Sequence, residues 1–264
     1  MSRRVNAHVV LSALLVVAAA LLIPALAFAS AGGGAPASGG GGLGGASPTA
    51  TAQATTPAAT AQPGDAPVST TGNGITIATR AAAMLRGGMR FTGTVSPSNA
   101  GQLVEIERLG HQTSWAWAAT AHGTVAKDGT FTALWPANHI GRFQIRAVLE
   151  PSSGVAARAV AASPPLTVIV YRQAIATQFG PGFFGSTTAC GETLQRNMVG
   201  VANRTLKCGT KVAVYYHSRM IIVPVIDRGP YANSADWDLT TATANALGIA
   251  GTATVGAVSL PAQS

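Results

Sequence analysis

The segment "MIIVPVIDRGPY", Met220 to Tyr231, decides where the second half of the chain places a scarce negative charge. An apolar run that only Pro224 interrupts ends in one carboxylate, Asp227, and an Arg-Gly-Pro turn follows at once. The chain has nine acidic residues in 264, so a carboxylate at the end of a buried strand needs a reason. Gly229 permits an unusual backbone angle and Pro230 fixes the exit. We therefore expect the turn to aim Asp227 at a groove.

Two interpretations of Asp227 remain open at this point. Burial among isoleucine and valine side chains raises the pKa of a carboxyl, so Asp227 could keep a proton and donate it. The adjacent Arg228 would lower that pKa if its side chain pointed inward. The structural alternative is that Asp227 accepts backbone N–H groups within its own loop, as aspartate often does in turns.

The first 29 residues read as a signal peptide. Arg3 and Arg4 form a positive start, an apolar stretch follows from Val9 to Phe28, and Ala27-Phe28-Ala29 is an A-x-A-like cleavage site. The alternative is an uncleaved membrane anchor, because about 20 apolar residues can span a bilayer. In either case we expect the rest of the chain to be secreted or held at the cell wall.

The charge balance favours some partners over others. The formal net charge is +8, and removal of Arg3 and Arg4 with the signal peptide leaves +6. A basic surface outside the cell suits anionic polymers such as a cell wall, although solubility alone explains it equally well. The chain has no run of lysine and arginine with interleaved aromatic residues, which argues against nucleic acid as a partner.

Only two cysteines are present, Cys190 and Cys208. A pair close in sequence in an exported protein predicts a disulfide. Two cysteines are too few for a structural zinc site unless histidine joins them, and the histidine spacing does not support that. We therefore expect neither a metal nor another cofactor.

The chain divides by composition into segments with different character. Residues 30–74 are rich in glycine, alanine, threonine and proline, which predicts a disordered linker after the signal peptide of residues 1–29. Residues 75–171 hold short strand-like runs spaced about 8 to 12 residues apart, which predicts an antiparallel β-sandwich. The runs are "RFTGTVSP", "QLVEIERL", "SWAWAATAHGTV", "TFTALWP", "GRFQIRAVLE" and "LTVIVYR", and "KDGT" at Lys127–Thr130 signals a hairpin turn.

Residues 172–264 predict a second unit that folds on its own. "TKVAVYY", "MIIVPVID" and "TATVGAVSL" are β-rich runs, and "DLTTATANALG" predicts one short helix. Asp238 or Thr240 can cap the start of that helix and Gly248 its end. Many short strands with one helix favour a compact barrel, so the fold class is mainly β throughout.

Both folded segments resemble known families. The succession of strands in residues 75–171 resembles bacterial immunoglobulin-like domains. From about Ala174 to Leu260, "FGPGFFG", "TACGE", "GTKV", "DRGP" and "DLT" occur in the order found in the rare lipoprotein A family. That family consists of exported, septal-ring-type lytic transglycosylases with a double-psi β-barrel, and the cysteine pair suits its actinobacterial-like branch.

The resemblance implies roles for individual residues. The positions of Glu192 and Asp227 match the family's acidic pair, which implies Asp227 as the acid and Glu192 as its assistant. Asn203 stands where the family usually has histidine, and asparagine can orient a sugar but cannot transfer protons at neutral pH. Glu192 could equally be an exposed loop carboxylate. The expected substrate-binding side chains, some of which could instead pack in the core or loops, are those of Asn203, Arg228, Tyr231 and Trp237.

The function implied by the resemblance is cleavage of peptidoglycan glycan strands to 1,6-anhydromuramic ends. Glycan strands would be the partner of the barrel, and the β-sandwich could contact cell-wall or division proteins. The alternative from another class is a non-catalytic, expansin-like module that binds wall polysaccharide without cutting it. Asn203 favours the second interpretation, whereas the retention of both acids favours the first.

Overall fold

The computed structural model describes residues 60–150, 161–232 and 234–260. The predicted signal peptide and residues 30–59 of the predicted linker lie outside these described residues. The chain divides into two units, Met1–Gln53 and Ala54–Ser264, and every described residue belongs to the second. No helix within the described ranges has the length and apolar character that crossing a membrane requires.

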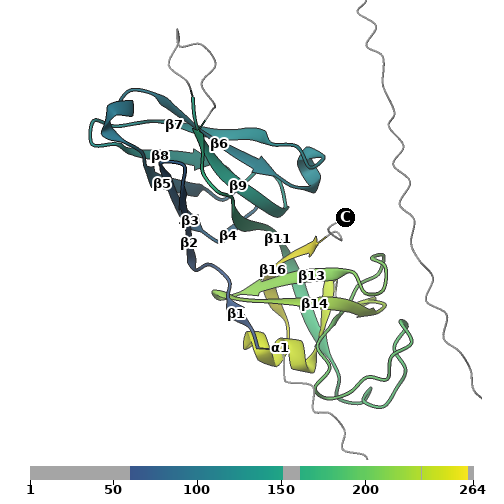
Figure 1. The fold of residues 1–264 in the computed structure, drawn as a ribbon. Helices are drawn as coiled ribbons and strands as arrows, with labels where there is room; N and C mark the ends of the chain where they lie inside the picture. The colour runs from purple at the N-terminus through teal and green to yellow at the C-terminus, as the bar shows by residue number, and fades with distance from the viewer. Residues whose placement is uncertain (1–59, 151–160, 233, 261–264) are drawn as a thin grey trace, which may run out of the picture. The chain divides into compact units, whose positions relative to one another are not determined.

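The described residues 67–150 and 161–171, here called the N-terminal module, form two sheets (Figure 1). The first sheet is antiparallel in the order β2 (Pro67–Gly72), β3 (Ile75–Arg80), β5 (Met89–Thr94) and β8 (Thr130–Trp135). The second runs β11 (Leu166–Phe179), β9 (Gly141–Leu149), β6 (Leu103–Leu109) and β7 (Ala118–Thr124). Short elements complete the module: β4 (Ala82–Met84), β10 (Ala161–Ala162) and the 3₁₀ turns Pro97–Asn99 and His111–Thr113.

Alternation of buried and exposed residues holds these sheets together. Phe131, Ala133 and Trp135 of β8 point inward, while the residues between them face solvent. Trp135 meets Phe143 of the opposite sheet edge to face, with ring centroids 5.5 Å apart. The two sheets therefore enclose one common core, as expected for strands of period two. Each of the six quoted runs contributes a strand.

The long strand β11 connects the N-terminal module to the C-terminal one. Its first half pairs with β9 and β4, and its second half pairs with β16 (Ala253–Leu260) and β15 (Trp237–Thr240). The predicted boundary between residues 171 and 172 lies in the middle of this strand.

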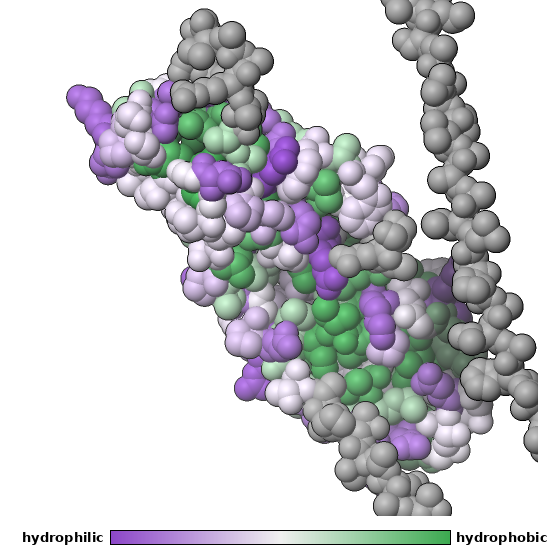
Figure 2. Space-filling view, viewed as in Figure 1, coloured by the Kyte–Doolittle hydropathy of each residue, from purple (hydrophilic) through white to green (hydrophobic). Residues whose placement is uncertain are grey.

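The C-terminal module closes on itself as a barrel. Its order is β15, β12 (Val201–Ala202), β14 (Arg219–Asp227), β13 (Lys211–Tyr216), β16 and β11, and β15 also pairs with β11. Within the described residues this makes a closed six-stranded β-barrel, in agreement with the predicted double-psi barrel. Figure 2 shows apolar residues gathered over β13 and β14 on the outside of this barrel.

The predicted helix is α1, Thr241–Leu247, and it buries Ala244 and Leu247 against the barrel. Of the two candidate caps, Thr240 is the one used, because its side chain accepts the N–H of Thr243. Gly248 ends the helix with a φ of 77°. Asp238 therefore does not cap the helix.

The folded part begins earlier than composition predicted. Within the predicted linker of residues 30–74, β1 (Gln62–Pro63) pairs with β14 of the barrel, and β2 pairs with β3. The expected linker is therefore wrong from about residue 62 onward. The prediction of a hairpin at "KDGT" is also wrong, because the strands on either side of this turn, β7 and β8, belong to different sheets.

Candidate active site

Asp227 ends β14 beside a short strand that brings a second aspartate into register. Ala202 of β12 pairs with Asp227 on one side and with Asp238 of β15 on the other. Neighbouring strands lie about 4.8 Å apart, so the two aspartate backbones are about 10 Å apart in one row. Ala202 between them is small and buried, and both carboxylates face the same cavity.

Asp227 is held by backbone groups. Its Oδ1 accepts the N–H of Ala189 and the N–H of Arg228, both at 2.8 Å. The guanidinium of Arg228 does not reach the carboxylate; it donates to the backbone carbonyls of Asn203 and Asp227 and lies 3.4 Å from the sulfur of Cys208. Arg228 therefore makes no hydrogen bond or ion pair with the Asp227 carboxylate among the described residues, and the loop contacts of the structural interpretation are present.

Asp238 occupies a half-buried position and keeps its proton more readily than an ordinary aspartate. Burial raises the pKa of its carboxyl, and the negative charge of Asp227 raises it further, while a hydrogen bond from Thr177 Oγ1 at 2.9 Å lowers it. The net direction is upward. Two carboxylates that face one cavity, one of them with a raised pKa, are an arrangement suited to donating and accepting a proton on the same substrate.

The cavity that contains both aspartates has a volume of about 330 Å³. Gly229, with a φ of 121°, and Pro230 shape one wall, as the sequence predicted. Two aromatic side chains line it with unusual exposure, Tyr231 at 78% and Phe183 at 58%. Exposed planar rings beside carboxylates are suited to stacking on sugar rings.

The predicted disulfide is confirmed. Cys190 and Cys208 are bonded, with Cα atoms 5.7 Å apart. The bond ties the loop that carries Ala189 to the segment after β12. Because the N–H of Ala189 donates to Asp227, the disulfide fixes one of the two donors that orient the carboxylate.

Glu192 lies on the same loop but outside this cavity. The backbone of the loop closes on itself through Thr188, which donates its N–H to the Glu192 carbonyl at 2.8 Å. The Glu192 side chain is exposed and is not among the residues that line the cavity. Asp227 and Asp238 both line this cavity, and Glu192 belongs to the loop whose residues Thr187 and Thr188 also line it.

The four expected substrate-binding side chains are divided between two cavities. Arg228 and Tyr231 line the aspartate cavity, whereas Asn203 and Trp237 line a separate one of about 310 Å³. Asn203 Oδ1 accepts the N–H groups of Thr205 and Leu206, so the amide supports its own loop. Within the described ranges, no histidine lines the aspartate cavity, and no group of His, Cys, Asp and Glu is placed to hold a metal.

Sequence reasoning missed Asp238 because it considered that residue as a helix cap. The sequence offered both Asp238 and Thr240 as that cap, and the structure shows that Thr240 fills it while the Asp238 carboxylate accepts a hydrogen bond from Thr177. The register that pairs Asp238 with Ala202 and Thr177 joins segments far apart in sequence and could not be read from the motif alone.

The sequence of the barrel is similar to that of known proteins. Residues 172–259 match the family described as lytic transglycolase. This segment of the barrel is also similar to rare lipoprotein A proteins. The probable endolytic peptidoglycan transglycosylase RlpA of Synechocystis is 35% identical over 123 residues, which cover 45% of this chain and 38% of that protein. The endolytic peptidoglycan transglycosylase RlpA of Campylobacter jejuni is 39% identical over 75 residues, 28% of this chain and 27% of that protein.

The matches stop well short of the relatives' full length. The chain spans less than two fifths of each of these RlpA proteins. The family match itself covers residues 172–259, which belong to the barrel. Among solved structures, a repeat from the extending region of a large adhesion protein superposes with a TM-score of 0.31 at 12% identity, covering 75% of this chain and 50% of that one. That value is too low to support an argument about the N-terminal module.

Proposed function

We propose that the protein is an exported, peptidoglycan-acting lytic transglycosylase. The observation that carries the proposal is the pair Asp227 and Asp238, which share one row of the barrel and one cavity. The names of the matched relatives support peptidoglycan as the substrate.

In this proposal Asp238 is the proton donor. Its raised pKa favours a proton at the carboxyl, which can pass to the glycosidic oxygen as the bond to the muramic C1 breaks. The 6-hydroxyl of the same sugar attacks C1 and gives up its proton, and Asp227 is positioned to accept it or to stabilise the positive charge. The product is a 1,6-anhydro end, and no water is consumed.

The remaining expected residues take supporting roles in the proposal. Tyr231 and Phe183 stack on sugars at the rim of the cavity, and Arg228 supports the turn after Asp227. Glu192 contacts the glycan beyond the cleaved bond. We further propose that the N-terminal module is an immunoglobulin-like sandwich that spaces the barrel from, or attaches it to, the wall.

The rival proposal is a module that binds glycan without cutting it. Two observations favour it: Asn203 is committed to its own loop, and the described part of the aspartate cavity has no imidazole. Both rivals use the exposed aromatic rim.

Mass spectrometry of purified glycan strands after incubation with the protein separates the two. The enzyme proposal expects 1,6-anhydromuramic ends from the wild type and none from Asp227→Asn or Asp238→Asn. Glu192→Gln is the matched carboxylate control and should retain most of the release. A wild type that binds strands, yields no anhydro ends and binds equally well as Asp238→Asn would favour the binding module.

A further inference from the structure

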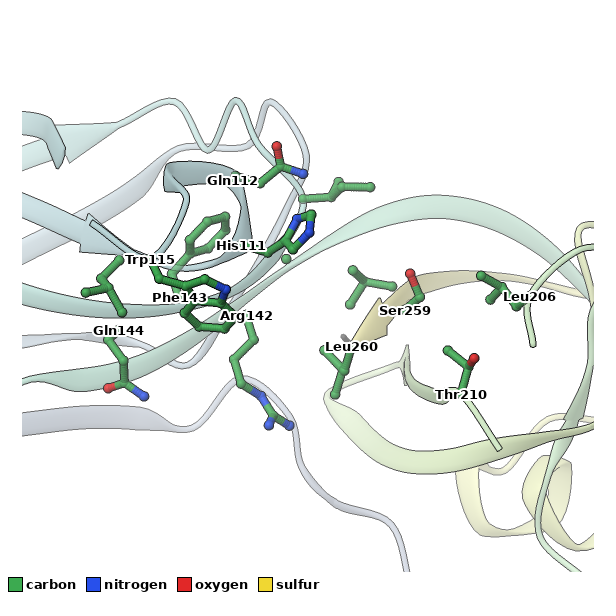
Figure 3. Close-up of a pocket in the computed structure, with 14 residues that line it drawn as sticks. His111, Gln112, Trp115, Arg142, Phe143, Gln144, Leu206, Thr210, Ser259 and Leu260 are labelled. Carbon is green, nitrogen blue, oxygen red and sulfur yellow. The ribbon is translucent and has the colours of Figure 1, made fainter. Parts of the chain in front are cut away.

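The disulfide between Cys190 and Cys208 lies at the surface of the barrel. Cys208 is exposed and Cys190 is half-buried. Leu206 and Thr210, two residues to either side of Cys208, line a cavity of about 410 Å³ where the barrel meets the N-terminal module (Figure 3). An external thiolate can therefore approach Cys208 in the folded protein. Exposed disulfides are more readily reduced than buried structural ones and are more often regulatory.

A positive charge stands beside the sulfur of the exposed cysteine. The Nη2 atom of Arg228 lies 3.4 Å from the Cys208 Sγ. The guanidinium donates its other hydrogen bonds to backbone carbonyls, and among the described residues it forms no ion pair with a carboxylate. A thiolate is the reactive form of a thiol, and a nearby guanidinium both attracts an incoming thiolate and stabilises one that is released.

The loop that carries Cys190 has few other ties to the barrel. The backbone hydrogen bonds of residues 181–198 lie within the loop or at its base. Among the described residues, the hydrogen bond that joins the loop to the body of the barrel runs from the Ala189 N–H to Asp227 Oδ1. The Cys190 sulfur also contacts a backbone carbonyl at 3.8 Å, and Leu194 is buried. The disulfide is therefore the main covalent or polar restraint on this loop.

Opening the disulfide would act directly on Asp227. Cys190 follows Ala189 in the chain, so movement of Cys190 removes one of the two N–H donors that hold the carboxylate. Gly191 and Gly209, which follow the two cysteines, have left-handed backbone angles, and open space surrounds the position of a side chain at either residue. Neighbouring side chains therefore do not keep the released cysteines together.

We infer that Cys208 is a redox modification site, at which a dithiol protein outside the cytoplasm opens the disulfide and releases the loop from Asp227. One thiolate of the dithiol attacks Cys208 Sγ, the S–S bond breaks, and Cys190 leaves as a thiolate that takes a proton from water. The second thiol gives up its proton to solvent and attacks the dithiol sulfur of the mixed disulfide, so that Cys208 leaves as a thiolate beside Arg228. The barrel disulfide gains two electrons, and the dithiol is oxidised to a disulfide.

Equilibration of the folded full-length protein in dithiothreitol buffers of defined redox potential tests the site, with free thiols counted by alkylation and mass spectrometry. Two thiols should appear without denaturant. Arg228→Gln should shift the equilibrium constant about tenfold toward the disulfide, which corresponds to about 30 mV, and Arg228→Lys should restore most of the shift. Lys211→Gln is the matched control, because the exposed Lys211 lies on the same segment and contacts neither sulfur among the described residues.

A thioredoxin variant that keeps only its attacking cysteine tests which sulfur is attacked. After rapid alkylation, the mixed disulfide should map to Cys208 and the alkyl group to Cys190, because the second step of the exchange is blocked. A mixed disulfide at Cys190 instead would overturn the assignment of Cys208.

Hydrogen exchange followed by mass spectrometry gives a readout that needs no activity. Reduced protein should exchange faster in residues 181–198 and at an unchanged rate in α1. The inference rests on the proposed function only for one consequence, the loss of glycan cleavage on reduction and its return on reoxidation. Thiols that form only in urea, equal equilibria in wild type and Arg228→Gln, or unchanged exchange in the loop would overturn the inference. Redox-dependent exchange in a protein that cleaves in neither state would support the site and contradict the proposed function.

Discussion

In the proposed reaction Asp238 would serve as the acid at the expense of stability. Its carboxyl is half-buried beside Thr177, and Asp227 lies across one strand. Burial and the neighbouring charge both raise its pKa above the ordinary value of 3.8. The folded protein therefore binds a proton in a pH range where the unfolded chain has released it. Its favourable contribution is complete below pH 3.8 and is lost as the pH rises through the folded-state pKa.

Asp238→Asn should consequently raise the thermal midpoint at pH 7 while abolishing glycan cleavage. The amide removes the penalty of a half-buried charge but cannot donate a proton as an acid. Calorimetric scans at several pH values check the first effect, and the gain over the wild type should vanish as the pH falls below about 4. Glu192→Gln removes an exposed carboxylate and should show no such pH-dependent gain. A mutant that loses stability at neutral pH would contradict the burial argument.

Thr177→Val should move the pH dependence of cleavage. The Thr177 hydroxyl donates to Asp238 and holds down the pKa of its carboxyl, so loss of the hydroxyl should raise that pKa. If Asp238 must be protonated to act, the alkaline limb of the rate profile should shift to higher pH. An unchanged limb would exclude Asp238 as the titrating acid.

Asn203→His tests the residue that departs from the family. Because Asn203 Oδ1 accepts the N–H groups of Thr205 and Leu206, the substitution should cost about 1 kcal/mol in lost loop capping. We expect no gain in anhydro product, since Asn203 lines a different cavity from the aspartates. Asn203→Asp keeps the acceptor and should restore stability in urea unfolding. A clear gain in product from Asn203→His would show that the missing imidazole limits turnover.

At the scale of elements, strands with strong alternation were predictable and their partners were not. β8 could be recognised from its alternating residues. The β6 run does not alternate strictly at Val104, Ile106 and Leu109, and its pairing with β7 has a register shift between Ile106 and Glu107. The predicted boundary after residue 74 separated the two strands of one hairpin. β2 and β3 are joined by the turn Asn73-Gly74, in which both residues have left-handed backbone angles. Asn-Gly is a strong hairpin signal, and the glycine- and threonine-rich surroundings concealed it.

The site, too, could be predicted only where it depends on local sequence and not on strand pairing. Asp227 stands at the end of an apolar run and before a turn that combines a permissive glycine with a rigid proline, so local sequence sufficed to single it out. Asp238 depends on β12, a strand of two residues that joins β14 to β15. Such a short strand has no recognisable pattern, and its pairing exists only because the barrel closes.

The disulfide should stabilise both the fold and the position of Asp227. Cys190 and Cys208 are 18 residues apart, and closing a loop of this size is worth about 3 kcal/mol on the chain-entropy account. The Cys190→Ser/Cys208→Ser double mutant should lose about 2 to 5 kcal/mol in urea unfolding. It should also lose cleavage below its melting temperature, because Ala189 would hold Asp227 less firmly. Unchanged cleavage in folded mutant protein would confine the disulfide to stability.

At the scale of the whole described unit, the two modules share structure rather than merely adjoin. β11 belongs to a sheet of each, and β1 pairs with β14 of the barrel before the chain enters the N-terminal module. A third cluster of buried side chains joins Ile169 and Tyr171 to Ala213, Val258 and Leu260. Tyr171 is fully buried and stacks on Tyr215, with ring centroids 5.3 Å apart. The barrel segment that carries the family motifs, residues 172–264, therefore depends for its packing on residues before position 172.

Truncation tests this dependence. A fragment of residues 172–264 lacks Leu166–Tyr171, which exposes the barrel side of the third cluster and should lower stability by several kcal/mol, since each large buried apolar side chain contributes about 1.5 to 3 kcal/mol. A fragment of residues 164–264 keeps the whole of β11 and should be the more stable of the two. Residues 60–264 should unfold in one calorimetric transition, because neither module keeps its core when the shared strand is released. Two separate transitions, or a 172–264 fragment as stable as the 164–264 fragment, would show that the barrel is independent and that the motif boundary marks a true domain boundary.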